Sequence, residues 1–400
     1  MLSKSPGKPT LIRDINRSMV LETIEKEGPI SRADISRLTK ISSPTVSLVV
    51  EHFLKKGIVR EKGMGESSGG RKPTLIELNP NGGFVIGIDL GGTNIKLVLV
   101  GLDGKIVKKL KGPTINSSSK NKILDRLREL IHGVIDELDA DRDLILGMGI
   151  GVSGVTDESG RVSFAPALGW EDMPVRDLLK EEFKIPVAVE NDVNAAALGE
   201  KLFGVGKTVK NFVFVAIGTG VGAGIIINGE LYKGFANAAG EVGYLVMGDG
   251  YLKDYRKGFG CFESLISGSA IAARAANQMC SYDSASMGIA FRQDKNITAK
   301  DVFEAAKRKD KIALKIVEEV SKYLAIGLGN ISVLLNPEMI VLGGGISKQE
   351  DILLKPLREM IVKITPIPPK IVISSLGDDT GVIGAAALAW DLVKHTSLIS

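Results

Sequence analysis

Residues 83–96 of this chain have the sequence GFVIGIDLGGTNIK, and this stretch decides the fold. An apolar run ends near Asp89, two glycines follow, and a second apolar run starts after Thr93, which predicts two strands joined by a tight turn. Glycines have no Cβ, so they let backbone N–H groups approach an anion closely. We therefore predict a phosphate-binding turn, with a ligand-free tight hairpin as the alternative. Its candidate residues are Asp89, Gly91, Gly92, Thr93 and Lys96.

The pattern of this stretch occurs twice. Residues 83–109 and residues 211–233 each have the pattern of three short strands separated by two tight turns. Helices and a further apolar strand follow in both cases, at 144–150 and at 339–342. We therefore predict an internal duplication, with two α/β lobes and a cleft between them.

Two more glycine turns strengthen the phosphate prediction. Their candidate residues are Gly218, Thr219, Gly220 and Gly222 in one, and Gly343, Gly344 and Gly345 in the other. The last turn follows an apolar strand and suits a nucleotide base or ribose. A carboxylate such as Asp89 can hold Mg²⁺ through water, and a hydroxyl such as that of Thr93 can donate to phosphate. Tight hairpins without a ligand remain the alternative here too.

A polar triplet, Glu190-Asn191-Asp192, ends the β-branched run that starts at Pro186. Polar side chains at the carboxyl end of a strand face the ligand in this kind of architecture. Asp192 can accept a proton from a substrate hydroxyl, and it can also cap the helix predicted after it. Asn191 offers a donor and an acceptor to a sugar hydroxyl, and Ser153 lies in another polar loop after an apolar strand.

The positive charge of the chain is concentrated in its first 80 residues. They carry 14 Lys and Arg against 9 Asp and Glu, whereas the remaining residues carry 37 against 38. A basic segment on a near-neutral body is typical of nucleic-acid binding, although a solvated basic tail has the same charge.

The order of predicted helices favours DNA binding. Apolar spacing predicts a helix over 10–27, which Gly28-Pro29 ends. Ser31 is expected to cap a short helix, and Ser42 or Ser43 caps the next one, with Pro44 at its first position. This helix-turn-helix presents small hydroxyl residues at the start of the second helix, where a recognition helix contacts bases. The candidates are Ser43, Thr45 and Ser47, each of which is equally suited to capping.

A wing is expected to follow the recognition helix. Strands are predicted at 58–61 and 74–78, with a glycine- and serine-rich tip between them that ends in Arg71 and Lys72. These two cations can contact phosphates or enter a narrow minor groove. A flexible linker with two solvated charges is the alternative.

Length, composition and cysteine count limit the class of protein. A chain of 400 residues with 44% hydrophobic content predicts two or three globular domains. Two cysteines are too few for a disulfide framework or a four-cysteine zinc site. The sequence has no secretory h-region and no 18-residue apolar run, so we expect a cytoplasmic protein without a membrane partner.

Together these motifs resemble the ROK family, whose name stands for repressors, open reading frames and kinases, within the sugar kinase/actin/Hsp70 fold. The resemblance covers nearly all of residues 81–390, and the winged head suits the xylose-repressor-type subgroup. The motifs that carry it are Asp89-Leu90-Gly91-Gly92-Thr93, Glu190-Asn191-Asp192, Ile217-Gly218-Thr219-Gly220-Val221-Gly222, Gly240-Glu241-Val242-Gly243, Gly260-Cys261-Phe262-Glu263 and Gly343-Gly344-Gly345.

The resemblance implies a domain plan and residue roles. The plan is a winged helix-turn-helix at 1–80, a first α/β lobe at 81–195 completed by a C-terminal helix at 381–400, and a second α/β lobe at 196–380. Asp192 is implied as general base, the glycine turns as the ATP phosphate site with Mg²⁺, and Asn191, Asp192, Glu241 and Glu263 as ligands of sugar hydroxyls.

The sequence departs from the family at its zinc site. The resemblance implies a histidine and three cysteines as ligands, and the matching positions here hold Tyr244, Asp254, Arg256 and Cys261. One thiol cannot close a tetrahedral site, so we expect no structural zinc. Tyr244 then presents a phenol to the sugar where an imidazole is usual.

Four functions remain open at this stage. The first is a sugar-responsive transcription factor, most simply a repressor, that binds operator DNA as a homodimer or a dimer of dimers. The second is an ATP-dependent sugar kinase of glucokinase or N-acetylhexosamine kinase type. The third combines both activities, and the fourth is an inactive kinase that uses ATP only as a structural ligand.

Overall fold

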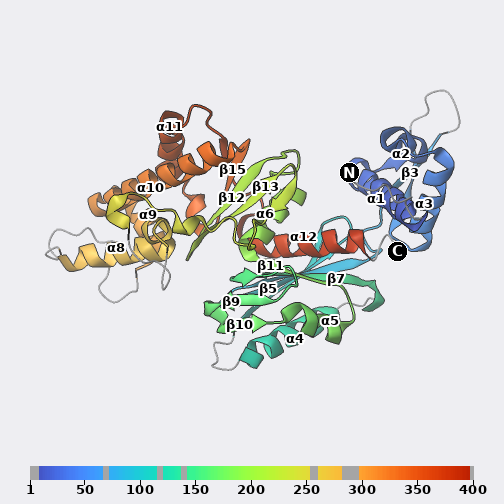
Figure 1. The fold of residues 1–400 in the computed structure, drawn as a ribbon, viewed down its shortest axis with the longest axis horizontal. Coiled ribbons are helices and arrows are strands. Elements are labelled where there is room, and N and C mark those ends of the chain that lie inside the picture. Colours follow the sequence, from blue (N-terminus) through green and yellow to red (C-terminus); the bar gives the residue numbers. More distant parts are fainter. Residues whose placement is uncertain are drawn as a thin grey trace, which may run out of the picture. The chain divides into compact units, whose positions relative to one another are not determined.

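The computed structural model describes residues 9–65, 72–114, 120–136, 142–252, 260–281 and 297–396. They form two compact units, one of residues 1–192 with 385–400 and one of residues 193–384 (Figure 1). Within the described ranges, no helix is long and apolar enough to cross a membrane.

The first unit begins with a small helical head. Its elements are α1 (Pro9–Glu27), β1 (Ile30–Ser31), α2 (Arg32–Thr39), α3 (Ser43–Lys55), β2 (Val59–Met64) and β3 (Thr74–Leu78). The three strands form one sheet in the order β1-β3-β2, with β2 and β3 antiparallel. This is the predicted helix-turn-helix with a two-stranded wing.

The starts of α2 and α3 differ in their capping. The Ser31 hydroxyl accepts a hydrogen bond from the Asp34 N–H at 3.1 Å, as the sequence predicts. The N-cap of α3 is Ser42, one of the two predicted candidates, although its side chain makes no capping hydrogen bond; Pro44 is the second residue of the helix and not the first. Proline is tolerated there because the first N–H groups of a helix have no partner within it.

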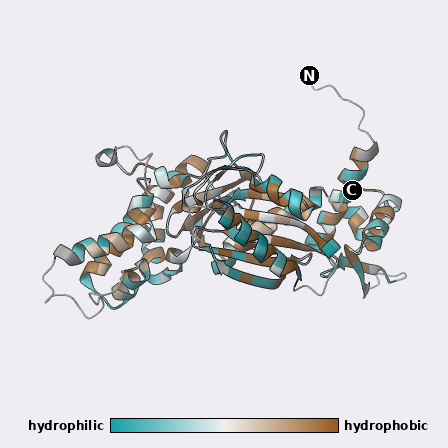
Figure 2. Cartoon of the chain, turned by 90° about the horizontal axis from the view of Figure 1, so that it is seen from below, coloured by the Kyte–Doolittle hydropathy of each residue, from teal (hydrophilic) through white to brown (hydrophobic). Residues whose placement is uncertain are grey.

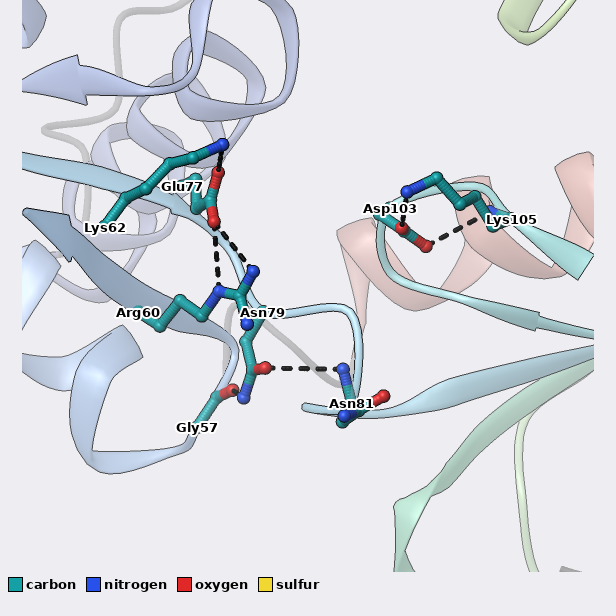
Figure 3. Close-up of polar contacts among 8 residues, drawn as sticks. All are labelled: Gly57, Arg60, Lys62, Glu77, Asn79, Asn81, Asp103 and Lys105. Carbon is teal, nitrogen blue, oxygen red and sulfur yellow. Dashed lines mark hydrogen bonds and ion pairs between the residues drawn. The ribbon is translucent and has the colours of Figure 1, made fainter. Parts of the chain in front are cut away.

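The segment that leaves the head is tightly packed (Figure 3). The Asn79 side chain donates to the Gly57 carbonyl at 2.8 Å, and the Asn79 backbone N–H donates to Ile58 at 2.9 Å. A Cβ added at Gly82 would lie 2.1 Å from the Gly57 carbonyl oxygen. The chain therefore has little freedom between the wing and the first strand of the body.

The body of the first unit is a mixed five-stranded sheet in the order β11-β7-β4-β5-β6. Its strands are β4 (Phe84–Leu90), β5 (Asn94–Gly101), β6 (Ile106–Pro113), β7 (Ile145–Val152) and β11 (Val187–Asn191). Strands β4, β7 and β11 run parallel, and β5 and β6 complete an antiparallel meander with β4. A smaller sheet contains β8 (Val155–Thr156), β9 (Val162–Ala165) and β10 (Trp170–Met173).

Helices cover both faces of this sheet. On one face, α4 (Lys120–Asp136) and α5 (Val175–Phe183) contribute to one core with alternate residues of β4, among them Ile86 and Ile88. On the other face, α12 (Thr380–His395) comes so close that a Cβ at Gly149 would lie 2.0 Å from the Ala385 carbonyl oxygen. Gly149 is required by this packing.

The second unit repeats the sheet of the first. Its strand order is β14-β13-β12-β15-β16, the counterpart of β6-β5-β4-β7-β11. The strands are β12 (Phe212–Ile217), β13 (Val221–Ile227), β14 (Glu230–Tyr232), β15 (Met339–Gly343) and β16 (Lys370–Ile373). The predicted duplication is therefore confirmed in strand order and direction.

Alternation along β12 explains how its helices pack. Phe212 and Phe214 share a core with α6 (Asp192–Leu202), whereas Val213 and Val215 belong to the core on the opposite face. The helices associated with that face are α7 (Glu263–Ile266), α8 (Gly268–Ser281), α9 (Ala299–Lys307), α10 (Lys311–Leu335) and α11 (Lys355–Ile364). Figure 2 shows hydrophobic residues along the strands and mixed hydropathy along the helices, as expected for sheets covered on both faces and for amphipathic helices.

Candidate functional site

The first glycine turn lies between β4 and β5 and is held by backbone contacts. Gly91 N–H donates to Asn94 at 3.1 Å, and the Thr114 hydroxyl donates to the Gly91 carbonyl at 2.7 Å. A Cβ added at Gly92 would lie 2.7 Å from the Ala167 Cβ. The fold alone thus requires glycine at position 92, and Thr93 at the tip is exposed.

Asp89 and Lys96 form an ion pair across this hairpin. The two residues are directly opposed in register, with Lys96 Nζ 3.5 Å from Asp89 Oδ2. Burial raises the pKa of the Asp89 carboxyl above its usual range, and the nearby Lys96 ammonium partly offsets that rise. A carboxylate is the ligand type that Mg²⁺ takes, whereas the Lys96 ammonium adds a positive charge beside the turn.

The predicted polar residues of the first unit meet at one edge of the sheet. Asp89 pairs with Gly151 across β4 and β7, and Gly151 pairs with Glu190 across β7 and β11. Ser153 directly follows β7, and its N–H donates to Leu90 at 3.3 Å. Asn191 ends β11, and its side chain donates to the Gly154 carbonyl at 3.0 Å, while Asp192 opens α6.

Glu190 was not assigned a role from the sequence, although it belongs to the motif. It is only 3% exposed, and its carboxylate accepts the Asn191 N–H at 3.0 Å and the Thr156 hydroxyl at 3.4 Å. These contacts fix the backbone at the point where Asn191 and Asp192 emerge. A charged residue inside a strand of apolar residues was the available signal.

The second and third glycine turns lie side by side in the second unit. Ala216 on β12 pairs with Gly343 on β15, so both strands end at the same edge. A Cβ at Gly344 would lie 2.3 Å from the Ile217 carbonyl oxygen, and Gly344 has a φ of +87°. Helix α8 begins beside the second turn, where Gly268 N–H donates to the Gly218 carbonyl at 2.8 Å.

The glycines of these turns differ in what the fold demands of them. A Cβ at Gly343 would lie 2.3 Å from Phe214, and one at Gly222 would lie 3.1 Å from Val193. At Gly218 and Gly345, in contrast, an added Cβ would meet no atom of the described residues within 4 Å, and neither φ is left-handed. Glycine at these two positions has no explanation within the fold and fits close approach of a ligand.

The predicted sugar-binding residues of the second unit adjoin the second glycine turn. Glu263, at the start of α7, accepts the Val221 N–H at 2.7 Å through Oε2, and a Cβ at Gly220 would be 2.7 Å from the same oxygen. Glu241 precedes a short 3-10 turn (Val242–Tyr244), and the exposed Tyr244 ends it. The acceptor carboxylates are therefore next to a turn predicted to hold phosphate.

Both carboxylates of this group are shifted toward the protonated state. Burial, and secondarily the charge of Glu263, raises the pKa of Glu241. Burial also raises the pKa of Glu263, against the hydrogen bond from Val221. A pair of partly dehydrated acceptors gains from sugar hydroxyl donors, which is chemistry that suits a polyol ligand.

The candidate DNA-contacting residues lie on or near α3 and the wing. Ser43 is exposed, Thr45 and Ser47 are half-buried, and Lys72 is exposed; Arg71 lies outside the described residues. Of the other wing cations, Arg60 and Lys62 both pair with Glu77, at 2.9 and 2.8 Å (Figure 3). Glu77 therefore neutralises part of the charge that the sequence count assigns to the wing.

The C-terminal helix contacts the head. Trp390 Nε1 donates to Glu25 Oε1 at 2.7 Å, and Lys394 Nζ lies 3.2 Å from Glu25 Oε2. Trp390 and Lys394 on α12 are buried, and Glu25 lies on α1. Nothing in the local sequence predicted this link, because its partners are more than 360 residues apart in the chain.

Fold and motifs define a protein class, namely an actin-like sugar kinase fold joined to a DNA-binding head. Within that class, the chain belongs to the ROK family, whose profile matches residues 85–391. A winged helix-turn-helix DNA-binding profile matches residues 13–60.

Known proteins resemble the chain over its full length or over its body. A xylose repressor of Caldicellulosiruptor bescii is 34% identical over 96% of this chain and 97% of the relative. The crystal structure of a ROK family transcriptional regulator, a homologue of the E. coli MLC protein, superposes with a TM-score of 0.85 at 25% identity, covering 97% and 98% of the two chains. A ROK family glucokinase from Streptomyces griseus, solved with glucose and AMPPNP, covers 77% of this chain and 99% of its own, with a TM-score of 0.66 and 31% identity.

Proposed function

We propose that this protein is a sugar-responsive transcriptional repressor. The observation that carries the proposal is a winged helix-turn-helix on the same chain as a ROK body, the combination also found in a full-length relative called a xylose repressor. The head supplies DNA binding, and the body supplies the ligand response.

On the DNA side, the N-terminal end of α3 would enter the major groove. Ser43, Thr45 and Ser47 lie in its first two turns, and Lys72 with Arg71 would contact the backbone or the minor groove. Two heads are needed for a palindromic operator, so a homodimer or a dimer of dimers is part of the proposal.

On the ligand side, each unit carries its own group of predicted sugar-binding residues. Ser153, Asn191 and Asp192 lie at the sheet edge of the first unit, and Glu241, Tyr244 and Glu263 lie together in the second. We propose that a sugar binds residues of these groups and thereby favours one of two arrangements of the protein. Such a ligand acts on DNA affinity only if it binds the two arrangements differently.

The experiment is a footprinting assay with the full chain on its own upstream region, with and without a panel of sugars. We expect a discrete footprint that one sugar weakens by at least about tenfold in affinity, a typical coupling energy. The variant Thr45→Ala should weaken the footprint, whereas Thr23→Ala on α1 serves as a matched control. Absence of any sequence-specific footprint would contradict the proposal.

A second function is favoured by the retained site residues. Asp89, Gly218 and Asp192, which the family resemblance links to phosphoryl transfer, are all present. If ATP binds, it supplies the phosphoryl group; the glycine turns would hold its phosphates and Asp89 its hydrated Mg²⁺. Asp192 would accept the proton of the sugar hydroxyl.

Sugar-dependent ADP release tests this second function. The variant Asp192→Asn should lower turnover by about 10²–10⁴-fold, the usual contribution of a general base. Turnover equal in the variant and the unmodified chain would show that Asp192 is not the base. No turnover in either would leave the chain a repressor without kinase activity.

A further inference from the structure

The segment 240–263 carries three of the predicted sugar ligands, and zinc does not explain how it is held. The residues at the family's metal positions do not fit a zinc ion. Cys261 is fully buried, and its Sγ accepts a hydrogen bond from Met247 N–H at 3.4 Å, whereas the Tyr244 side chain is exposed. The other two positions, Asp254 and Arg256, lie outside the described residues, and a guanidinium cannot ligate a metal.

A pair of tyrosines links this segment to a long helix instead. Tyr251 ends a short 3-10 turn (Asp249–Tyr251), and its hydroxyl lies 2.6 Å from the hydroxyl of Tyr323 near the middle of α10. The rings meet edge to face, with centroids 6.2 Å apart and planes at 90°. Both geometries are favourable for aromatic and hydrogen-bonded pairs.

The tyrosine pair stays intact over the physiological pH range. The hydrogen bond to Tyr323, together with burial, raises the pKa of Tyr251 to about 12. The phenol is therefore neutral at physiological pH and keeps its proton for the hydrogen bond. In this respect the pair differs from a zinc site, whose ligands compete with protons.

Close packing joins the two ends of the segment. A Cβ added at Gly260 would lie 2.3 Å from the Gly243 carbonyl oxygen and 2.8 Å from the Tyr244 Cα. Glu241 lies two residues before Gly243 and Glu263 lies three residues after Gly260, so this contact holds the two carboxylate-bearing stretches together. The Gly240 carbonyl also accepts the Ala223 N–H at 2.8 Å, which ties this end to β13 of the central sheet. Within 244–252, the side chains of Leu245, Met247 and Tyr251 pack against the core of the second unit, and Tyr251 adds a hydrogen bond to α10.

We infer that the Tyr251–Tyr323 pair, together with the buried Cys261 thiol, replaces the zinc ion as the brace of the sugar-binding segment. Tyr251 and Tyr323 are positioning residues, since neither is predicted to contact the sugar and both act by holding the segment that carries the sugar-binding residues. The consequence for sugar affinity rests on the proposed function, whereas the bracing itself does not.

Hydrogen exchange of the full chain tests the brace directly. The variants Tyr251→Phe and Tyr323→Phe each remove one hydroxyl of the same hydrogen bond and keep both rings. Amides of residues 244–252 should exchange about two- to tenfold faster in either variant, the range expected for one hydrogen bond. The double variant should be no faster than the singles, because both changes break the same bond. Tyr232→Phe, at a half-exposed tyrosine on β14, is the matched control and should change nothing.

The competing explanation is tested in the same samples. Dialysis of the unmodified chain against a strong zinc chelator should leave exchange at 244–252 unchanged. About one equivalent of zinc by elemental analysis, with faster exchange after its removal, would overturn the inference. Unchanged exchange in both phenylalanine variants would overturn it as well.

Sugar binding gives the functional readout. Calorimetry on a sugar that binds the unmodified chain should show a dissociation constant raised about two- to tenfold in both variants, in step with the exchange rates. If no sugar binds the unmodified chain, the proposed function fails, and the exchange data still decide the brace. Faster exchange with unaltered sugar affinity would overturn the positioning role of the tyrosines.

Discussion

The two repeats of this protein have one strand order but different glycine turns. In the first repeat, Gly92 is pressed against Ala167, and Asp89 and Lys96 bring opposite charges to the turn. In the second, a Cβ added at Gly218 would meet no atom of the described residues within 4 Å, and α8 begins beside this turn. The two repeats therefore share a backbone arrangement but differ in the chemistry of their turns. The first turn carries a pair of charged side chains, whereas the second offers backbone N–H groups.

The largest effect is expected from Gly92→Ala in the first turn. The new Cβ would lie 2.7 Å from the Ala167 Cβ, so part of the backbone must shift. We expect the free energy of unfolding to fall by about 1–3 kcal/mol, as for other overpacked sites. Urea denaturation followed by circular dichroism measures this change. Stability equal to that of the unmodified chain would mean that the two turns do not differ sterically.

The matching change in the second turn, Gly218→Ala, should separate binding from stability. Because its Cβ has open space, the free energy of unfolding should stay within about 0.5 kcal/mol of the unmodified value. Affinity for a nonhydrolysable ATP analogue should fall about tenfold or more, since the methyl group blocks close approach of phosphate to the backbone. Gly133→Ala on α4, another glycine with open space, is the control and should bind the analogue normally. Equal affinity in both variants would remove the second turn from the nucleotide site.

A charge-removing change tests the first turn. In Lys96→Met the ammonium that lies 3.5 Å from Asp89 is lost, and a phosphate ligand loses a nearby positive charge. We expect the ATP-analogue affinity to fall about threefold to fivefold at low salt, with the loss shrinking near about 0.5 M salt because of screening. The loss in Gly218→Ala should persist at high salt. If the loss of affinity depended on salt equally in the two variants, the two turns would not differ in how they bind phosphate.

The smallest effect concerns the carboxylates beside the second turn. The pKa values of Glu241 and Glu263 are raised in the folded chain, so the folded state binds these protons more tightly than the unfolded one. Their contribution to stability is therefore fully present below the ordinary value near 4.5 and is lost as pH rises through the higher folded values. Glu263→Gln removes the Glu263 carboxyl and lowers the pKa of Glu241, because the charge of Glu263 contributes to raising it.

The readout is the difference in unfolding free energy between Glu263→Gln and the unmodified chain, measured from about pH 4 to 7. As pH rises, the unfolding free energy of the variant should increase relative to that of the unmodified chain by only about 0.5 kcal/mol, because solvent screens partly exposed groups. Glu230→Gln, at an exposed position on β14, should show no such trend. A difference that moves the other way would contradict the raised pKa values.

Sequence reasoning worked best where a signal was local. The apolar runs at 84–90 and 212–217, each ended by a glycine turn, predicted both central strands, and Ser31 with Asp34 predicted the cap of α2. The helix-turn-helix was found from its caps and breakers; Ser42, one of the two predicted candidates, is the N-cap of α3, and Pro44 is the second helical residue, not the first. The roles assigned to individual site residues stay predictions until the variants are measured.

Signals that depend on distant partners were missed. Glu190 owes its importance to Thr156, 34 residues away, and Glu77 neutralises two wing cations that a charge count adds to the DNA-binding potential. The Tyr251–Tyr323 contact spans 72 residues and the Glu25–Trp390 contact spans 365. No periodicity or motif links such positions, because their proximity results from the packing of whole elements.

The sequence by itself determined that this protein has a winged head, a duplicated α/β body and three glycine turns. Those features follow from backbone sterics and local hydrogen bonding, which act over a few residues. Only the tertiary structure decided which glycines the fold requires, as at Gly92 and Gly344, and which it leaves to a ligand, as at Gly218 and Gly345. The physical reason is that a glycine's neighbours in space, and not its neighbours in sequence, set the room available for a Cβ.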